Sequence, residues 1–295
     1  MARNNLHLGT APDSWGVWFP DDPAQVPWHR FLDEAAAAGY AAVELGPYGY
    51  LPTDPARLRD ELAQRDLTLT GATAGTHLHR DGDALADALA ECRPVAALLT
   101  EMGATDLVVL PAMYTDLHTG ALLESAELTA EQWQRLGRRH SELGRILYEE
   151  FGVQQRFHPH ADAHVDDRAS IDRFLSVTDP GTVSLCLDTG HVAYAGADNR
   201  AIVADHPDRI GYVHLKSVDL EVAAKGLPFA EAVRQGAMVE PQDGVPDMPP
   251  LLADLDALGR PLWAIVEHDM YPAAPDAPLP IARRTCGYYR SAGLT

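Results

Sequence analysis

Short apolar runs alternate with longer amphipathic stretches along the chain. Runs of this length are typical of buried strands, and we predict eight, at residues 6–11, 41–45, 67–72, 106–111, 153–158, 183–188, 210–215 and 262–267. Between them, apolar residues recur at helical spacing, which predicts helices over 28–39, 54–66, 129–152, 170–178 and 249–260. Eight strands that alternate with helices indicate an α/β fold, a (β/α)₈ TIM barrel.

The predicted barrel takes in residues 1–295 as a single domain, because no linker, repeat or low-complexity segment divides the chain. A doubly wound open sheet is the structural alternative. However, the first strand is not followed by the Gly-x-Gly-x-x-Gly turn of dinucleotide-binding folds. One long irregular stretch, residues 216–250, follows the seventh strand, and on a barrel this position lies at the catalytic face.

Composition narrows the classes of partner. The net charge of −20, from 23 basic and 43 acidic residues, argues against a nucleic-acid partner. Cys92, Cys186 and Cys286 form no CxxC pair, which favours reduced thiols in a cytoplasmic protein. The N-terminus lacks the apolar stretch of a signal peptide, and no window approaches the roughly 20 apolar residues of a membrane helix. We expect a cytoplasmic protein with no membrane partner, and a homo-oligomer is compatible with this composition.

Ionisable side chains gather where the predicted strands end. They are Glu44 after the second strand, His158 and His160 after the fifth, Asp188 and His191 after the sixth, His214 and Lys216 after the seventh, and Glu267 after the eighth. A barrel brings the carboxyl ends of its strands around one pocket, so we expect these side chains to converge. His77 and His79, in the loop after the third strand, are weaker candidates because solvated histidines are also common in such loops.

Carboxylate and imidazole groups that converge in one pocket form the usual ligand set of Mn²⁺, Co²⁺, Zn²⁺ or Mg²⁺. Asp188, His214 and Glu267 come from adjacent strands, and His158 or His160 would add a fourth ligand. Taken alone, Asp188 is equally typical of a helix N-cap, and a buried histidine is more often a hydrogen-bonded core residue. Candidates on four consecutive strands together favour a metal site.

Several motifs resemble a known family. The matching segments are GTAPDSWGVW, AAVELGPYGYLP, FHPHADAHV, LCLDTGHVAYAGAD, DRIGYVHLKSVD and WAIVEHDMYP, which run from Gly9 to Pro272. With them the chain resembles the sugar isomerase/epimerase superfamily of xylose-isomerase-like TIM barrels, and most of all its inosose dehydratase group. The resemblance implies a divalent metal on His158, Asp188, His214 and Glu267. Relatives that act as epimerases usually have Glu at the position of His158.

The chain departs from the inosose dehydratase pattern in two segments. After His160 it has ADAH in place of a small-Gly-Thr turn, and residues 235–248 read QGAMVEPQDGVPDM in place of a Gly-rich turn that ends in Asp-Phe. Both departures fall on loops that we expect to contact the substrate.

The expected chemistry follows from the metal, which would chelate a ketone oxygen and a neighbouring hydroxyl and stabilise an enolate. His160 and Glu267 are the candidate base and acid. His191 and Lys216 would hold substrate hydroxyls or polarise the ketone, and Glu44 is a further substrate contact unless it pairs with an arginine. Trp15 offers an apolar face to a sugar ring, or else packs at the barrel end. Gly190 would let the chain turn sharply between Asp188 and His191.

We therefore predict a divalent-metal-dependent lyase of the inosose dehydratase type, with Mn²⁺ or Co²⁺ expected first and Mg²⁺ or Zn²⁺ as alternatives. Its small-molecule substrate would be a keto-cyclitol or keto-sugar that loses a β-hydroxyl from the enolate. Reprotonation of the same enolate would make the protein a ketose epimerase or isomerase, and cleavage of a C-glycosidic bond would make it a C-glycoside lyase. A non-catalytic sugar-binding barrel is the alternative from outside the enzymes.

Overall fold

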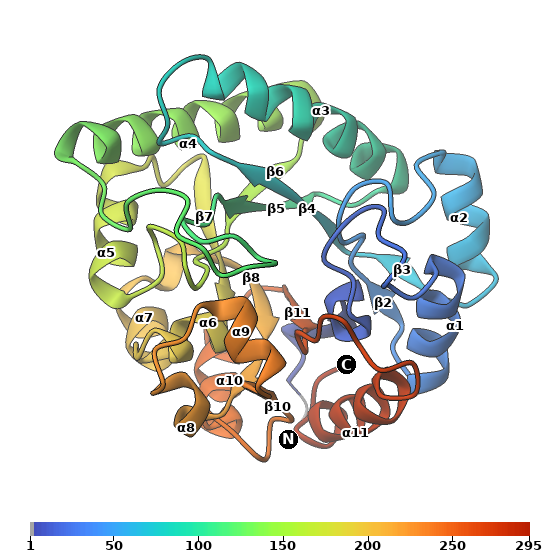
Figure 1. Cartoon of the computed structure of the whole chain (residues 1–295). Coiled ribbons are helices and arrows are strands. Elements are labelled where there is room, and N and C mark those ends of the chain that lie inside the picture. The colour runs from blue at the N-terminus through green and yellow to red at the C-terminus, as the bar shows by residue number, and fades with distance from the viewer. Residues whose placement is uncertain (1–2) are drawn as a thin grey trace.

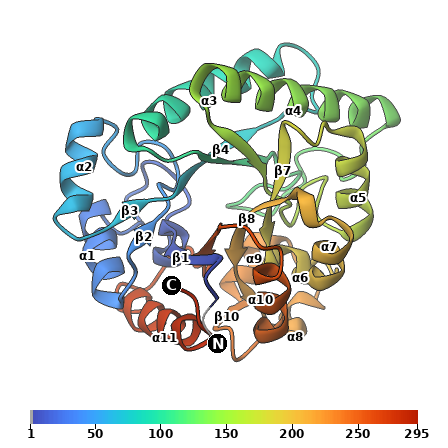
Figure 2. The same cartoon turned by 180° about the vertical axis from the view of Figure 1, so that it is seen from behind.

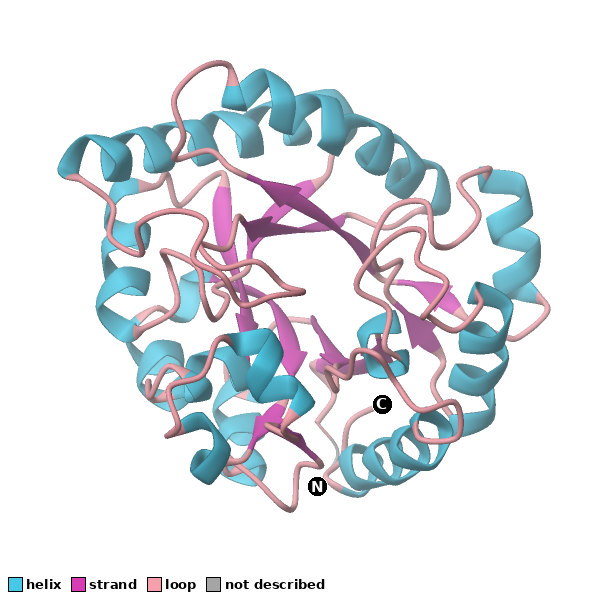
Figure 3. Cartoon of the chain, viewed as in Figure 1, coloured by secondary structure: helices cyan, strands magenta, loops and turns pink. Residues whose placement is uncertain are grey.

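Parallel strands form the centre of the molecule, and helices surround them as a ring (Figure 1, Figure 3). The structure, a computed structural model, describes residues 3–295. Within this range the central sheet consists of β1 (Leu6–Thr10), β2 (Ala42–Val43), β3 (Thr68–Leu69), β4 (Gly71–Thr76), β5 (Asp106–Pro111), β6 (Gln154–Phe157), β7 (Val183–Asp188), β8 (Ile210–Leu215) and β11 (Leu262–Val266). Their order is β3-β2-β1-β11-β8-β7-β6-β5-β4.

The two edges of this sheet are consecutive segments of the chain, because only Thr70 separates β3 from β4. Past the end of β2, Leu45 N donates to Gly71 O (2.9 Å), and Pro47 forms a parallel bridge with Thr73. The stretch of chain formed by β3 and β4 therefore pairs with β2 on one side and with β5 on the other, and the sheet closes. With β3 and β4 counted as one strand, the predicted (β/α)₈ barrel is confirmed.

The helices are α1 (Trp28–Ala38), α2 (Pro55–Ala63), α3 (Ala84–Met102), α4 (Ala130–Phe151), α5 (Arg168–Val177), α6 (Thr189–Tyr194), α7 (Asn199–Asp205), α8 (Leu220–Ala223), α9 (Phe229–Arg234), α10 (Met248–Asp256) and α11 (Pro278–Ser291). All five predicted helices are confirmed. The prediction missed α3, which contains Pro94, a residue that usually ends a helical pattern. It also missed α11, which carries prolines in its first turn.

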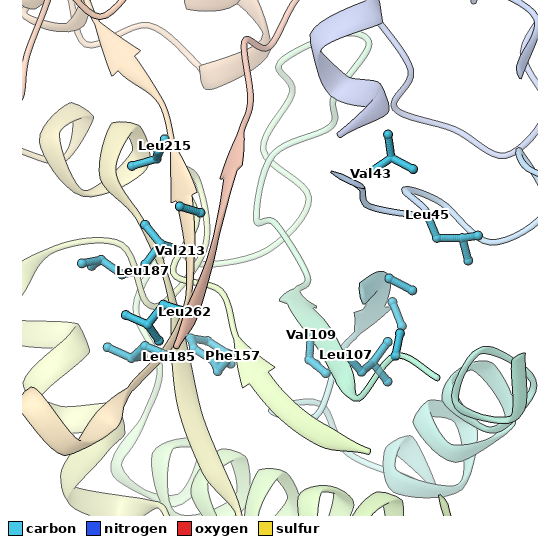
Figure 4. Close-up of a cluster of buried hydrophobic side chains, with 14 of the residues drawn as sticks. Val43, Leu45, Leu107, Val109, Phe157, Leu185, Leu187, Val213, Leu215 and Leu262 are labelled. Carbon is cyan, nitrogen blue, oxygen red and sulfur yellow. The ribbon is translucent and has the colours of Figure 1, made fainter. Parts of the chain in front are cut away.

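The alternation of side chains along each strand separates two cores. Leu185 and Leu187 of β7 lie in the large core between strands and helices, which Figure 4 shows. Cys186, between them in sequence, belongs to a smaller apolar cluster with residues of β5, β8 and β11. Because successive side chains of a strand point to opposite faces, Asp188 falls on the same, barrel-facing side as Cys186.

Different layers fill the barrel from its amino end to its carboxyl end. Near the strand starts, Arg156 Nε lies 2.6 Å from Asp106 Oδ1, and Arg156 Nη1 donates to Ser184 Oγ (2.6 Å). Gly211 makes room for this guanidinium, since a Cβ there would lie 2.2 Å from Arg156 Nη1. Above this layer lies the apolar cluster that includes Cys186, and ionisable side chains follow at the carboxyl end.

The segment 216–250 is not irregular throughout, as the sequence suggested. It contains α8, α9 and the short antiparallel pair of β9 (Ser217–Val218) and β10 (Met238–Val239). Elements of two to six residues are too short to show a period in the sequence, which explains why the prediction missed them. The segment does lie at the carboxyl end of the strands, because Phe229 of α9 lines the pocket described below.

The chain ends meet beside the barrel. Leu8 N of β1 donates to Thr295 O (2.8 Å), and Arg3 N donates to Gly293 O (2.8 Å) just after α11, which the view from behind in Figure 2 shows beside the C-terminus. Among the described residues, no helix has the length and apolar character needed to cross a membrane.

Candidate metal centre

Four strand ends bring two imidazoles and two carboxylates together at the carboxyl end of the barrel. They belong to His158 after β6, Asp188 in β7, His214 in β8 and Glu267 after β11, and we call these residues the strand-end cluster. All four are buried, and one ligand atom of each lies within 4.8 Å of the others. His158 Nε2 is 3.2 Å from Asp188 Oδ2, and His214 Nδ1 is 3.0 Å from Glu267 Oε2. Of the histidines at 158 and 160, the structure places His158 in this cluster.

Asp188 uses its two carboxylate oxygens differently. Oδ1 accepts from Gly190 N (2.8 Å) and His191 N (2.7 Å) and so caps α6, whereas Oδ2 faces the strand-end cluster. Asp188 therefore serves as the N-cap of α6 and is also available as a candidate metal ligand. The expected reason for Gly190 is wrong, because this residue lies inside α6. A Cβ there would lie 2.5 Å from Cγ of Lys216, so the position needs glycine to let the lysine stem pass.

Glu44 orients His214 and does not line the pocket. The carboxylate is fully buried, and its Oε2 accepts from His214 Nε2 (3.1 Å). Burial lowers the pKa of His214, but Cys186, Glu267 and Glu44 outweigh it and raise the pKa well above its usual value. With one proton held on Nε2 by Glu44, a metal ion would displace the other proton from Nδ1, the nitrogen that faces Glu267 and Asp188. This carboxylate–histidine arrangement is the one that commonly orients a metal-ligating imidazole. The expected substrate contact of Glu44 is corrected accordingly, and its partner is a histidine, not an arginine.

The donor set fits a divalent ion. His214 Nδ1 lies 3.0 Å from Glu267 and 3.8 Å from Asp188 without the alignment of a hydrogen bond to either. His158 Nδ1 is also buried without a hydrogen-bond partner. Buried polar atoms that lack partners are uncommon and costly, and two carboxylate oxygens with two imidazole nitrogens suit Mn²⁺, Co²⁺ or Zn²⁺. These residues therefore have the geometry and chemistry of a divalent-metal site.

Lys216 places an ammonium group beside the cluster. Its Nζ lies 3.1 Å from Asp188, 3.0 Å from Glu267 and 2.7 Å from Asp269, and the side chain is 2% exposed. Burial alone would lower the pKa of Lys216, but these three carboxylates raise it well above its usual value. Lys216 therefore stays charged. Sequence reasoning missed Asp269, although its position two residues after Glu267 was a usable signal.

The rings of His191 and His160 lie against one another beside the cluster, tilted by 33° with their centroids 3.8 Å apart. Burial, followed by the charges of His160 and Lys216, holds the pKa of His191 well below its usual value, so this ring is neutral. Ala161 N donates to His191 Nδ1 (3.2 Å), which leaves the ring proton on Nε2. His191 Nε2 lies 3.2 Å from Lys216 Nζ and 3.8 Å from Asp269 Oδ2, the carboxylate oxygen that Lys216 also contacts. A solvated His191 is excluded, since the residue is 1% exposed.

A pocket of about 370 Å³ opens onto these groups. Its polar lining includes His158, His160, His191, His214, Lys216, Glu267 and Asp269, and its apolar and aromatic lining includes Val17, Trp18, Pro47, Tyr48, Met113, Leu117 and Phe229. Trp15 is fully buried away from the pocket, where it packs on Phe31 and donates from Nε1 to Glu34. The expected sugar contact of Trp15 is therefore wrong, and Trp18 takes that place in the wall.

A family model described as xylose isomerase-like TIM barrel matches residues 32–291. The chain belongs to this family. An inosose dehydratase of Geobacillus thermodenitrificans (strain NG80-2) is 31% identical over 280 residues, which are 92% of each chain. The rhizopine catabolism protein MocC of Rhizobium meliloti is 34% identical over 272 residues, 87% of this chain and 80% of MocC. A solved structure of IOLI protein with a binding zinc atom has a TM-score of 0.75 at 16% identity and covers 98% of this chain and 99% of its own.

The resemblance drawn from the motifs is thus confirmed. However, the two segments in which the chain departs from the inosose dehydratase pattern do not line the pocket of this xylose isomerase-like barrel. As far as residues 3–295 are concerned, neither 161–164 nor 235–248 supplies a lining residue. Ala161 and Met238 instead pack with Phe229 in one apolar cluster, so these segments support the wall from behind.

The pocket carboxyls differ in protonation. Burial raises the pKa of Glu267, but His214 and Lys216 outweigh it and lower the value to about 2, so Glu267 stays ionised and does not suit the expected role of acid. Asp13, in the short helix Pro12–Trp15 after β1, lines the same pocket. Burial, then Glu267 and Asp269, raise the pKa of Asp13 well above its usual value, so Asp13 holds a proton more tightly than an ordinary carboxyl does. Sequence reasoning missed Asp13 because it assigned no ionisable candidate to the end of the first strand.

Proposed function

We propose that the chain is a divalent-metal-dependent lyase that dehydrates a keto-cyclitol through an enolate, as an inosose dehydratase does. The observation that carries this proposal is the strand-end cluster at a pocket whose other polar groups are positioned proton carriers and donors. The 31% identity to an inosose dehydratase over 92% of both chains supports the same substrate class.

We further propose that His158, Asp188, His214 and Glu267 hold Mn²⁺ or Co²⁺, with Zn²⁺ and Mg²⁺ as ions to compare. A bound divalent ion supplies a Lewis acid that stabilises negative charge developing on a substrate ketone oxygen. The cysteines support a reducing, cytoplasmic setting, because Cys92, Cys186 and Cys286 are buried and unpaired.

His160 is positioned to remove the proton next to the ketone. Its Nδ1 lies 2.6 Å from Ala161 O and must donate to it, which leaves the lone pair on Nε2. Burial, followed by the charge of His158, lowers the pKa of His160 to about 3, so the ring is neutral at physiological pH and keeps this lone pair free. The substrate proton would pass to Nε2, and the electron pair of the broken C–H bond would remain on the carbon and ketone oxygen.

Loss of the β-hydroxyl completes the dehydration. Lys216 Nζ and His191 Nε2, the two adjacent donors, would hold a hydroxyl oxygen of the substrate. Asp13 would donate its proton to the departing hydroxyl, which leaves as water while the electron pair from the C–H bond forms the new C=C bond. A protonated carboxyl in a pocket is suited to this role, because expulsion of hydroxide would otherwise be slow.

The test is to incubate the Mn²⁺-loaded protein with a panel of keto-cyclitols and ketoses in D₂O and to follow deuterium incorporation and enone absorbance. We expect a keto-cyclitol to exchange its α-proton and to lose water with a rise in enone absorbance. Inversion or isomerisation without an enone would favour the epimerase or isomerase alternative. Release of an aglycone from a C-glycoside would favour the C-glycoside lyase. If no compound exchanges its α-proton, the result would favour the non-catalytic sugar-binding barrel.

A variant tests the base separately. His160→Ala should retain bound metal, because His160 is outside the strand-end cluster, but should lose α-proton exchange. Exchange at the wild-type rate would transfer the role of base to another residue.

A further inference from the structure

A second group of imidazoles and a carboxylate lies outside the pocket. His79 follows β4, Glu124 belongs to the β5–α4 segment (residues 112–129), and His164 follows β6. We call these residues the rim cluster. We propose that the rim cluster is a second divalent-metal site, of the kind that binds Zn²⁺, and that it ties three loops together at the rim of the barrel.

The geometry of the rim cluster is that of an assembled site. His79 and His164 are 3% and 6% exposed, and their ring centroids lie 4.5 Å apart. His79 Nε2 is 3.1 Å from Glu124 Oε1, and one ligand atom of each residue lies within 4.8 Å of the other two. Ligands at the Zn–N and Zn–O distances of about 2.0–2.1 Å lie about 3.3 Å apart in a tetrahedron, so His79 and Glu124 already have this spacing. The remaining gap requires only a small side-chain movement.

The hydrogen bond of His164 suits a metal. A metal-binding histidine must present a lone pair to the ion. His164 Nε2 lies 2.9 Å from Ser125 O and donates to it, which leaves a lone pair on Nδ1. A backbone carbonyl that holds the other ring N–H is the usual support of a metal-ligating histidine.

Two histidines with one glutamate leave a fourth position for water, as in other His₂Glu zinc sites. The side chain of Glu124 is 26% exposed, so solvent can reach this position. The competitor is Arg80, which donates from Nη2 to Glu124 Oε1 (3.0 Å) and from Nε to Glu124 Oε2 (3.3 Å). The Arg80 side chain is 43% exposed, so a dication that binds Glu124 would displace the guanidinium into solvent.

The position of Glu124 suggests what the site does. Near its start the β5–α4 segment carries Met113 and Leu117 to the pocket lining, and there it is held to the β6 loop by Tyr114 N, which donates to Asp162 O (2.8 Å). Glu124 lies towards the other end of the segment. A metal on the rim cluster would attach this second end to the loops after β4 and β6, and the wall of the pocket would be fixed at both ends. No residue of the strand-end cluster takes part, so this inference does not depend on the proposed reaction.

The experiment is a Zn²⁺ titration of the untagged, metal-stripped full-length protein, with metal content measured after removal of unbound ion. We expect two equivalents for the wild type and one equivalent for Glu124→Gln and for His164→Ala. The matched control is His77→Ala, because His77 lies two residues from His79 but is 37% exposed and should leave both equivalents in place. Glu124→Gln keeps the size of a partly exposed side chain, so it should fold even if His164→Ala does not.

Asp188→Asn distinguishes the two sites. It should retain one equivalent, and the double variant Asp188→Asn, Glu124→Gln should retain none. A wild type that binds one equivalent, or a Glu124→Gln protein that still binds two, would overturn the second site and leave the rim cluster as an ion-pair network around Arg80. If Asp188→Asn keeps two equivalents while Glu124→Gln loses one, the strand-end cluster fails as a metal site and the rim cluster stands.

Discussion

The strand-end cluster and the rim cluster contain the same kinds of side chain on different kinds of support. Asp188 and His214 sit on paired strands and are at most 1% exposed, and the parallel ladder between β7 and β8 places them directly opposite one another. Glu124 and His164 lie on loops, 40 residues apart, and Glu124 is partly open to solvent. The comparison teaches that a barrel sheet positions its donors through the strand ladder, whereas these loop donors are positioned by single contacts between loops, such as that of His164 Nε2 with Ser125 O.

The clusters also differ in how their negative charge is balanced. In the strand-end cluster, the positive charge of Lys216 is buried among carboxylates and is therefore held inside the barrel. In the rim cluster, Arg80 is exposed and free to leave Glu124. Removing an interaction should therefore have a large effect on activity and stability in the strand-end cluster and a small effect in the loop region.

The largest effect is expected for Asp188→Asn. The amide retains the Oδ1 that caps α6 but removes the charged oxygen that faces the other ligands, so metal at the strand-end cluster should be lost. Losing Lewis-acid stabilisation of about 4 kcal/mol should lower kcat/KM roughly 10³-fold or more. Metal content and steady-state kinetics measure this. The control is Asp198→Asn, because Asp198 caps α7 in a similar way at the surface and should leave both values unchanged.

The next largest effect concerns Lys216→Met, which preserves the stem but removes the ammonium group. The metal-free variant would leave Asp188, Glu267 and Asp269 buried without their cation, which should lower the free energy of unfolding by about 3 kcal/mol. Bound metal neutralises two of these carboxylates, Asp188 and Glu267, so the metal-induced rise in Tm should be larger than in the wild type. Thermal unfolding with and without Mn²⁺ measures both, and an unchanged Tm of the metal-free protein would contradict the charge balance described here.

A smaller effect is expected for His191→Ala, which touches the strand-end cluster only through Lys216 and the cap of Asp188. Loss of one substrate contact should lower kcat/KM roughly ten- to a hundredfold, with metal affinity almost unchanged. Kinetics and metal titration of the same protein check this. Unaltered kinetics would remove His191 from the substrate site, and lost metal would make it a ligand.

The smallest effect concerns the loop region, at Asp166, two residues from His164. Burial raises the pKa of Asp166 to about 6, so the folded protein resists ionisation of this carboxyl. Its contribution to stability is complete below about pH 4 and is lost as the pH rises through about 6. Asp166→Asn should therefore be more stable than the wild type at pH 8, by about 1 kcal/mol after allowance for partial exposure, and equal to it at pH 4. Denaturant unfolding of both proteins at both pH values tests this. Equal stability of the variant and the wild type at pH 8 would show that ionised Asp166 does not destabilise the folded protein.

The sequence predicts the strand-end cluster because two regular features coincide there. Apolar runs mark the strands, and each candidate ligand lies at the end of one, so barrel geometry brings them together. No such period connects His79, Glu124 and His164, since the paths of loops are set by tertiary contacts. The same reason explains why the predictions for Trp15 and Glu44 were wrong. The pattern places both residues near a strand end, but tertiary packing turns Trp15 into the core and directs Glu44 to His214.

The most direct test of the central claim is a metal titration of activity. The metal-stripped protein would be titrated with Mn²⁺ while enone formation from a keto-cyclitol is followed, beside Glu124→Gln and Asp188→Asn. The account predicts that the rates of the wild type and of Glu124→Gln rise from near zero and saturate, while Asp188→Asn stays inactive at every Mn²⁺ concentration. Full activity of the metal-stripped wild type, or activity of Asp188→Asn equal to that of Glu124→Gln, would contradict it.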